Sequence, residues 1–237
     1  MDIKEFCLAH GFDMSKCGVA LGGGGFEMTE LKISPVEFLT LAEDDFERGG
    51  LAALVNATTN AKRAIVSQLD QLLISFGYPS LRLNVPKKIE RLKALGLLAP
   101  SLLRKVVDMR NILEHEYTTP ELKNVEEALD IASLFVMSAS AMFIPFDDVL
   151  EFSLPDLFVA ESAVTHFSAG LNRETDRVFY TVYAYKSAGH GRSYVGQCEI
   201  QSGHVLFEAM VQLSASLMLR YKVNQALGDF EAAYTQL

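Results

Sequence analysis

The sequence lacks a hydrophobic run long enough to cross a lipid bilayer. Its longest uncharged apolar stretch, residues 131–146, is shorter than the roughly 20 residues that a spanning helix needs. We interpret that stretch as the end of a core helix. The first ten residues carry Asp2, Lys4 and Glu5 where a signal peptide would be apolar. We therefore expect neither membrane insertion nor secretion.

Cysteine is scarce, and its spacing indicates neither a disulfide framework nor a metal site. The chain has three cysteines, Cys7, Cys17 and Cys198, which is an odd number without the short intervals typical of metal ligands. A reduced cytoplasmic protein is the expectation, because disulfides persist mainly in oxidising compartments. No cluster of metal-ligating residues stands out, so we expect no metal and no cofactor.

Positive charge is in deficit overall but concentrated in one segment. Lys and Arg number 21 against 30 Asp and Glu, which gives a net charge of −9 and argues against nonspecific adhesion to nucleic acid. Between Tyr78 and Arg110, however, eight basic residues face two acidic ones, a local charge of +6. The eight are Arg82, Lys87, Lys88, Arg91, Lys93, Arg104, Lys105 and Arg110. They are either solvated helix faces or a basic strip that attracts an anion.

Apolar residues recur every three or four positions through the first two thirds of the chain, which predicts amphipathic helices. Ser34 and Pro35 form an N-cap and N1 pair with Glu37 in the first turn, and Gly49-Gly50 ends that helix. Proline or serine opens most of the segments, and glycine or proline closes most of them. The predicted helices cover about 35–48, 51–77, 86–96, 101–117 and 120–143.

The sequence changes character after Pro145, where Phe, Tyr and Val partly alternate with polar residues as in strands. We favour a helix for residues 204–222, because their apolar spacing suits one, and a paired strand is the alternative. The predicted strands cover about 152–160, 164–170, 177–186 and 192–200. The predicted fold class is α+β: an irregular N-terminal arm (1–34), a bundle of about five helices (35–145) and a smaller strand-containing α+β region (146–237).

The segment RNILEHEY, residues 110–117, combines side chains suited to phosphate chemistry. Histidine titrates near neutrality and can accept or donate a proton, whereas arginine keeps its charge and offers a rigid fork of donors to phosphate oxygens. On an ideal helix Asn111 and His115 share a face, but Arg110 and His115 point about 140° apart. A site that uses both residues is therefore best completed by a second copy of the helix across a two-fold axis.

These residues resemble the Arg-x4-6-His signature of HEPN domains (higher eukaryotes and prokaryotes nucleotide-binding). In that signature a polar residue, commonly Asn, follows the Arg, and here it is Asn111. The order of predicted helices is also similar: a long helix containing NAKRAI (60–65), a short helix, the motif helix and a closing helix. The resemblance covers about 35–145 and implies a HEPN-like bundle that forms a homodimer.

What the resemblance implies is metal-independent cleavage of RNA at a site shared by two protomers. One group takes the 2′-OH proton, another protonates the leaving 5′-oxygen, and a cation stabilises the phosphorane. Arg110 and His115 would be catalytic, and Asn111 would orient His115 or contact a phosphate. The basic strip would guide the RNA backbone into place. The RNA-binding candidates are Lys87, Lys88, Arg91, Arg104 and Lys105.

Tyr117 extends the resemblance to one group within the family. Arg-x4-His-x-Tyr resembles HEPN toxins that are paired with a nucleotidyltransferase antitoxin, which adenylylates the tyrosine. Carried over, Tyr117 would be the modification target, and the added phosphate would block the groove by its charge and bulk. The implied partners are RNA, a second copy of the chain, and an antitoxin or nucleotidyltransferase.

Two other functions fit the same residues. Arg110 can pair with Glu114 one turn away, and His115 can interact with the helix dipole, which would leave a catalytically silent module that binds a nucleotide, RNA or a protein. Alternatively, the strand-rich half is the active part of a regulatory ligand-binding protein. Cleavage of single-stranded RNA in EDTA would distinguish the nuclease from both.

Overall fold

The computed structural model describes residues 3–10, 13, 16–23, 26–97, 121–143, 148–154, 164–175, 177–188 and 191–236. The chain divides into two compact units, which we call the sheet unit and the helical unit. The sheet unit comprises Met1–Phe26, Ala94–Gly96 and Pro145–Leu237. The helical unit comprises Glu27–Lys93 and Leu97–Ile144.

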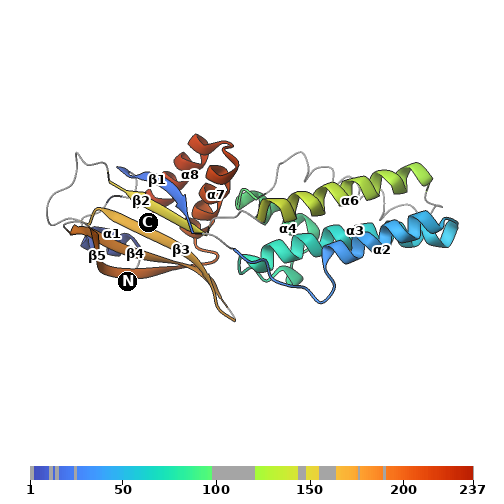
Figure 1. Ribbon diagram of the computed structural model, residues 1–237, viewed down its shortest axis with the longest axis horizontal. Coiled ribbons are helices and arrows are strands. Elements are labelled where there is room, and N and C mark those ends of the chain that lie inside the picture. The colour runs from blue at the N-terminus through green and yellow to red at the C-terminus, as the bar shows by residue number, and fades with distance from the viewer. Residues whose placement is uncertain are drawn as a thin grey trace. The chain divides into compact units, whose positions relative to one another are not determined.

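Three long helices pack together in the described part of the helical unit. α2 (Pro35–Arg48) packs on α3 (Leu51–Ser75), and α6 (Leu122–Phe143) packs on both (Figure 1). A 3-10 turn, η2 (Ser80–Arg82), and a shorter helix, α4 (Val85–Ala94), follow α3. The small side chains that α3 buries let its neighbours approach its backbone closely; among them are Ala53, Ala57, Ala61 and Ala64.

Local side-chain chemistry sets both ends of α2, as the sequence predicted. The Ser34 hydroxyl accepts a hydrogen bond from the backbone N–H of Glu37 at 3.1 Å, and the Glu37 carboxylate accepts one from the N–H of Ser34 at 2.6 Å. This reciprocal cap satisfies two N–H groups that the first helical turn leaves without partners. The hydrogen bond to Ser34 holds the pKa of Glu37 below its usual value. Gly49 and Gly50, with φ of 70° and 85°, then turn the chain into α3.

A buried ion pair connects α3 to α4. Lys88 Nζ lies 2.5 Å from Asp70 Oδ1, and the Ser80 hydroxyl of η2 donates to the same carboxylate oxygen. All three residues are at most 8% exposed. Because two donors share one buried carboxylate, the pair holds α3, η2 and α4 in one arrangement.

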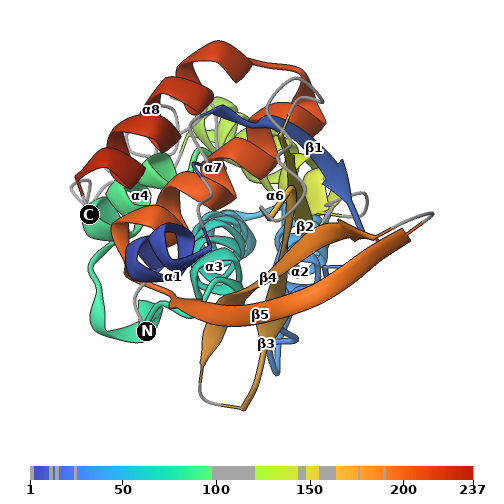
Figure 2. The same cartoon turned by 90° about the vertical axis from the view of Figure 1, so that its left-hand side faces the viewer.

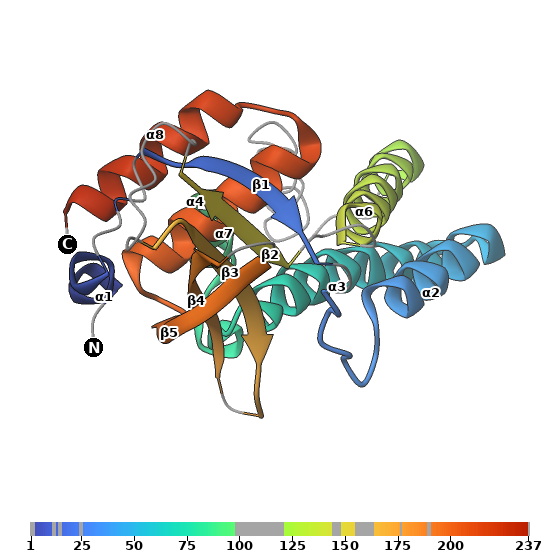
Figure 3. The same cartoon turned by 60° about the vertical axis from the view of Figure 1, so that its left-hand side comes forward.

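Among its described residues, the sheet unit contains a five-stranded antiparallel sheet, and three helices lie on one of its faces (Figure 2). Its strands, in spatial as well as chain order, are β1 (Gly18–Gly22), β2 (Val149–Ser153), β3 (His166–Arg173), β4 (Val178–Ala188) and β5 (Gly191–Gln201). The helices are α1 (Ile3–Ala9), α7 (Val205–Leu219) and α8 (Val223–Thr235). Figure 3 shows α7 and α8 lying along the same side of the sheet.

Aromatic side chains join the sheet to these helices. Phe152 of β2 stacks on Phe230 of α8 with ring centres 5.3 Å apart, and Phe6 of α1 meets the Phe167 ring of β3 edge-on at 5.7 Å. Tyr180 of β4 contacts the ring of Phe207 in α7 at 5.4 Å. Because side chains alternate along a strand, the residues between these point to the other face, which carries mostly polar groups.

The predicted fold arrangement was wrong. We expected an irregular N-terminal arm, a HEPN-like bundle of about five helices and a smaller strand-containing C-terminal region. Instead, the N-terminal residues supply α1 and β1 to the sheet unit, which comprises about half of the chain. β1 (GVALG) pairs with β2, about 130 residues later in the sequence. The fold is α+β in the broad sense, and the helix predicted at 101–117 lies outside the described residues.

In the part of the chain that the structure describes, none of the helices combines the length and apolar character needed to cross a membrane.

Candidate functional site

The residues on which the predicted cleavage chemistry depends lie outside the described part of the chain. Along the sequence they fall between α4 and α6. Their roles therefore stay predictions from the motif. They are Arg104, Lys105, Arg110, Asn111, His115 and Tyr117.

The three remaining RNA-binding candidates lie on α4 and have different surroundings. Lys87 and Arg91 are exposed, and the Arg91 guanidinium lies 5.5 Å from the centre of the Tyr78 ring, a cation–π contact. Lys88 is 5% exposed and pairs with Asp70. A phosphate could reach the Lys88 ammonium only by displacing a buried carboxylate. Lys87 and Arg91 are thus exposed to solvent, whereas the Lys88 ammonium is buried in an ion pair that stabilises the fold.

A groove of about 440 Å³ opens beside α3 in the helical unit. Its lining residues come from α2 and from one face of α3, where they recur at helical intervals of three and four. They are Phe38, Thr59, Lys62, Arg63, Val66, Ser67 and Asp70. The volume falls within the roughly 300–1,000 Å³ of small-molecule sites.

The groove combines an apolar wall, two cations and two hydroxyl groups. Phe38 and Val66 supply the apolar wall, and Lys62 and Arg63 supply the cations. The Thr59 hydroxyl donates to the Val55 carbonyl at 2.8 Å, and the Ser67 hydroxyl donates to a carbonyl of the same helix at 3.1 Å. Both hydroxyl oxygens therefore present lone pairs, and the groove can receive a ligand that is apolar at one end and anionic at the other.

Carboxylates near the groove cations have cationic partners of their own. Arg63 Nη1 donates to Asn60 Oδ1 at 3.3 Å, and Asn60 Nδ2 donates to Asp45 at 3.2 Å. Asp45 also binds Arg48 at 2.7 Å. Asp70, at the other end of the groove, pairs with Lys88 of α4. Arg48 and Lys88 therefore offset the charge of these two carboxylates.

A second polar cluster lies on the face of the sheet opposite α1, α7 and α8. Ser153 and His166 are directly opposed on β2 and β3, and Glu151 and Ser168 form the next row. His166 Nδ1 lies 2.8 Å from Ser153 Oγ, and the Ser168 hydroxyl donates to Glu151 Oε1 at 2.9 Å. His166 Nε2 contacts Glu151 Oε2, and Arg192 Nη1 of β5 lies 2.7 Å from the same ring nitrogen.

Glu151 and Arg192 favour opposite protonation states of one nitrogen. A guanidinium only donates hydrogen bonds, so its bond to His166 Nε2 requires that nitrogen without a proton, whereas the bond to Glu151 requires the proton. Burial is the largest cause that lowers the pKa of His166 below 6.5; Arg192 lowers it further and Glu151 opposes both. The cluster is therefore a proton-sensitive group in which the neutral imidazole is favoured.

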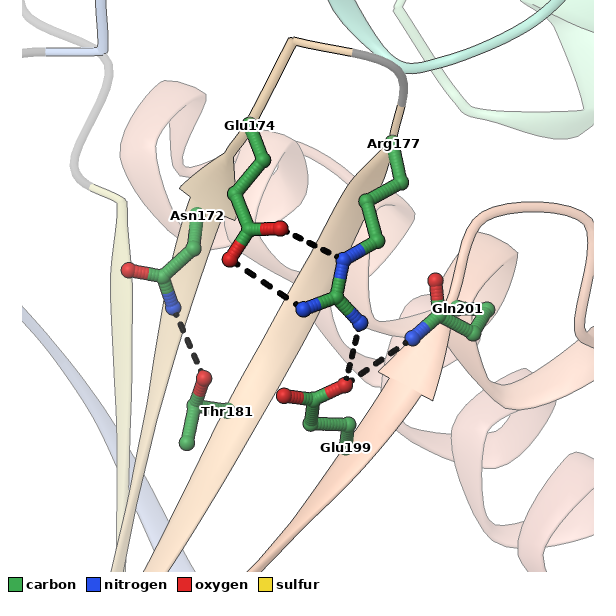
Figure 4. Close-up of polar contacts among 6 residues, drawn as sticks. All are labelled: Asn172, Glu174, Arg177, Thr181, Glu199 and Gln201. Atoms are coloured by element: carbon green, nitrogen blue, oxygen red, sulfur yellow. Dashed lines mark hydrogen bonds and ion pairs between the residues drawn. The ribbon is translucent and has the colours of Figure 1, made fainter.

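A third polar network closes the hairpin between β3 and β4 (Figure 4). Arg177 donates to Glu174 at 2.7 and 3.1 Å and to Glu199 of β5 at 2.7 Å. Gln201 also donates to Glu199, and the Arg177 guanidinium lies 4.2 Å from the centre of the Phe179 ring. Since two carboxylates already hold this guanidinium, the network offers an incoming anion little attraction.

The cysteines form no reactive centre. Cys7 and Cys198 are buried, and the described structure places none of Cys7, Cys17 and Cys198 in a disulfide. Burial, with the charge of Asp13, raises the pKa of Cys17 to about 12, and its thiol donates to the Asp13 carbonyl. A thiol at that pKa is a poor nucleophile at neutral pH. Across the described residues, no three His, Cys, Asp or Glu side chains are placed to hold a metal ion together.

Sequence reasoning did not identify either the groove or the His166 cluster. The intervals of Thr59, Lys62, Arg63 and Val66 were readable as one helix face, but the position of Phe38 depends on how α2 packs on α3. Likewise, the alternation of side chains along a strand places Glu151 and Ser153 on one face. Which residues of β3 lie opposite them depends on the register between the two strands.

Comparisons with known proteins do not place the chain in a family. No protein-family model matches it, and no curated protein or solved structure matches it either.

Proposed function

We propose that this chain is a metal-independent endoribonuclease of toxin or defence type. The observation that supports the proposal is the sequence Arg110-Asn111-x3-His115-x-Tyr117, which resembles the signature of HEPN ribonucleases. The exposed cations Lys87 and Arg91 of α4 precede this segment along the chain. The same proposal includes a cytoplasmic location, where RNA substrates are abundant.

The proposed reaction is internal attack of a ribose 2′-OH on the adjacent phosphate. The 2′-oxygen forms a bond to phosphorus and loses its proton to a base, while the bond to the 5′-oxygen breaks and that oxygen gains a proton. His115 serves one of these proton transfers, because imidazole titrates near neutral pH. Arg110 stabilises the phosphorane charge, and Asn111 positions His115 or a phosphate oxygen. The products are a 2′,3′-cyclic phosphate and a 5′-hydroxyl.

The proposed active unit is a homodimer. Arg110 and His115 point about 140° apart on an ideal helix, so one copy of the helix does not direct both at the same phosphate. A two-fold axis would bring Arg110 of one protomer beside the other protomer's histidine. Tyr117, in the same segment, is the residue that a nucleotidyltransferase antitoxin would modify.

A catalytically silent module that binds a nucleotide, RNA or protein is the second candidate. The groove beside α3 favours it, because Lys62, Arg63 and Phe38 can bind a ligand without any reaction at the motif.

The decisive experiment measures cleavage of single-stranded RNA by the purified full chain in EDTA. We expect cleavage with 2′,3′-cyclic phosphate ends, and a loss of at least about a hundredfold in rate for His115→Ala, because a positioned general acid or base contributes roughly 10²–10⁴-fold. Lys123→Ala, an exposed substitution on α6, is the matched control and should cleave like the unaltered chain.

If His115→Ala retains its far-ultraviolet circular dichroism and cuts RNA at the unaltered rate, the motif is not the reaction site. Toxicity on expression that a neighbouring gene relieves would favour the toxin form of the proposal.

A further inference from the structure

We infer that Ser153, His166 and Glu151 form a serine-hydrolase centre that cleaves carboxylic esters with an apolar acyl group. The three residues lie on β2 and β3 of the sheet unit, on the face opposite α1, α7 and α8. The inference uses none of the motif residues 110–117. It therefore goes beyond the proposed ribonuclease and does not depend on cleavage of RNA.

Strand register brings the hydroxyl, the imidazole and the carboxylate together. Ser153 and Glu151 are two residues apart on β2 and so project from the same face, and Ser153 lies directly opposite His166 of β3. Ser153 Oγ lies 2.8 Å from His166 Nδ1, and the other ring nitrogen, Nε2, contacts the Glu151 carboxylate. A nucleophile in contact with a base that a third group orients is the arrangement of serine hydrolases, on whatever fold it occurs.

The contacts of the imidazole suit a general base. With the proton on Nε2, the His166 ring donates to Glu151, and Nδ1 keeps a lone pair that accepts the proton of Ser153. The Ser168 hydroxyl donates to Glu151 Oε1 at 2.9 Å, so Glu151 is a held positioning residue. Burial, helped by Arg192, lowers the pKa of His166 below 6.5, and the ring is therefore neutral and able to accept a proton at pH 7.

Arg192 of β5 supplies positive charge beside the imidazole. Its Nη1 lies 2.7 Å from His166 Nε2 and 3.8 Å from Glu151 Oε2, and its side chain is 57% exposed. When Nε2 carries its proton and donates to Glu151, it offers no lone pair to the guanidinium. The donors of Arg192 can then turn to the carbonyl oxygen of a bound ester, where negative charge develops during attack.

Two tyrosines indicate the class of acyl group. Ser153, His166, Tyr185 and Tyr194 are paired in turn across β2, β3, β4 and β5, so they form one row on this face. The Tyr185 ring lies 6.1 Å from the His166 ring and 6.2 Å from the Tyr194 ring. Ser153 and Tyr194 are exposed, and Tyr185 is half-buried. Since neighbouring strands are about 5 Å apart, an acyl chain on Ser153 that crosses His166 reaches Tyr185 after about 10 Å.

The proposed reaction has two halves, and water is the co-reactant. Ser153 Oγ forms a bond to the carbonyl carbon of the ester, and its proton passes to His166 Nδ1. The bond from that carbon to the alcohol oxygen breaks, and His166 gives the proton to the leaving oxygen. Water then attacks the acyl-serine while His166 takes its proton. The bond to Ser153 Oγ breaks, the carboxylic acid leaves, and the serine regains its proton from His166.

A fluorophosphonate probe tests the nucleophile directly, because it reacts covalently with activated serine hydroxyls. We expect tandem mass spectrometry of the full chain to find the phosphonyl group on Ser153. Labelling should be at least about a hundredfold slower in His166→Gln, which lacks the general base. Ser193→Ala, on β5, is the matched control and should be labelled like the unaltered chain.

A pair of esters tests the acyl group. We expect the full chain to hydrolyse p-nitrophenyl octanoate at least about tenfold faster than p-nitrophenyl acetate, because the longer chain buries more apolar surface on the tyrosines. Tyr185→Ala should reduce this preference, whereas Tyr185→Phe keeps the ring and should retain it. Equal rates for the two esters would contradict the assigned substrate class.

The pH dependence of labelling separates catalytic from structural roles. The rate should fall as the pH drops through the pKa of His166, below 6.5, because a protonated ring cannot accept the proton of Ser153. Glu151→Gln removes a carboxylate that raises this pKa and should shift the midpoint down, whereas Arg192→Ala removes a cation that lowers it and should shift the midpoint up. Tyr185 also contacts the ring, and Tyr185→Phe should leave the midpoint unchanged.

Three results overturn the inference. The first is a full chain whose Ser153 stays unlabelled. The second is His166→Gln with unaltered circular dichroism and an unaltered rate of labelling. The third is a midpoint that neither Glu151→Gln nor Arg192→Ala shifts, because the ring would then have only a structural role. His115→Ala distinguishes the two proposals, since it should lose RNA cleavage and keep the labelling of Ser153.

Discussion

At the scale of single residues, His166 shows how a sheet can hold an imidazole in its neutral form. His166 is 3% exposed, and its ring lies between Ser153 and Glu151 of the paired strand β2 and Arg192 of β5. Tyr185 of β4 adds a ring 6.1 Å away. The carboxylate partly offsets the cost of charging the ring, but burial and the guanidinium outweigh it, and the pKa falls.

This lowered pKa predicts that the protein becomes less stable as the pH falls below 6.5. In the unfolded chain His166 takes up a proton near its usual pKa, whereas the folded chain takes it up only at lower pH. The unfolded state therefore binds more protons in that window, and the free energy of unfolding decreases with falling pH. Above 6.5 both states are neutral, so the contribution is complete there.

Urea unfolding at a series of pH values tests this prediction. His166→Gln should reduce the loss of unfolding free energy between pH 6.5 and the folded pKa. Arg192→Ala removes a cation that disfavours the imidazolium, and it should move the His166 pKa upward in an NMR titration. If His166→Gln showed the same pH dependence of unfolding free energy as the unaltered chain, the pKa of His166 would not be lowered by folding.

At the scale of elements, the Asp70–Lys88 pair predicts how firmly α4 is attached to α3. Lys88→Met leaves the buried Asp70 carboxylate with the Ser80 hydroxyl as its remaining partner, and we expect a loss of about 3–5 kcal/mol in the free energy of unfolding. Asp70→Leu/Lys88→Met removes both charges and should recover much of that loss. Urea unfolding provides the measurement.

Lys87→Met, an exposed substitution one position earlier on α4, is the control and should change stability by no more than about 0.5 kcal/mol. If Lys88→Met were as stable as this control, the ion pair would not hold the two helices together.

The helices that carry strong local signals were predictable from the sequence. Serine–proline starts, glycine stops and apolar periodicity located α2 and α3, and α4 and α6 begin within two residues of the predicted starts. α7 is the helix that we favoured for residues 204–222, and β3, β4 and β5 overlap three of the four predicted strands. These elements depend on interactions within a few residues, and such interactions are visible in a single sequence.

The elements that depend on distant partners were not predictable. β1 (GVALG) has glycine at both ends and little strand propensity of its own, and it forms a strand because β2 supplies its hydrogen-bond partners. For the same reason, no local pattern shows that Phe38 of α2 shares a groove with Lys62 of α3, or that His166 faces Ser153. Interactions between residues close in sequence can be predicted from local patterns, whereas contacts between distant elements depend on the completed fold.

At the scale of the whole molecule, the proposed active site predicts complementation between two inactive chains. Arg110→Ala and His115→Ala should each be inactive alone, but a mixed dimer would combine the intact Arg110 of one chain with the other chain's intact His115. With random exchange in an equal mixture, half the dimers are mixed and each has one complete site, so about a quarter of the unaltered activity should return. The measurement is RNA cleavage after denaturing and refolding the two variants together.

The control for this experiment is refolding each variant alone, which should restore nothing. If both residues act within one protomer, the mixture stays as inactive as its components. Analytical ultracentrifugation of the same samples shows whether dimers form at all, and a monomer would exclude the shared site.

The pairing of β1 with β2 has a consequence for how the protein is made. The sheet begins before the helical unit in the sequence and is completed after it, with about 130 residues between the paired strands. At a synthesis rate of roughly 5–20 residues per second, β1 leaves the ribosome roughly 6 to 26 seconds before β2. During that interval the helical unit can fold, but β1 does not yet have its partner strand. β1 is short and has glycine at both ends, so while it is unpaired it offers other chains only a short edge for strand pairing.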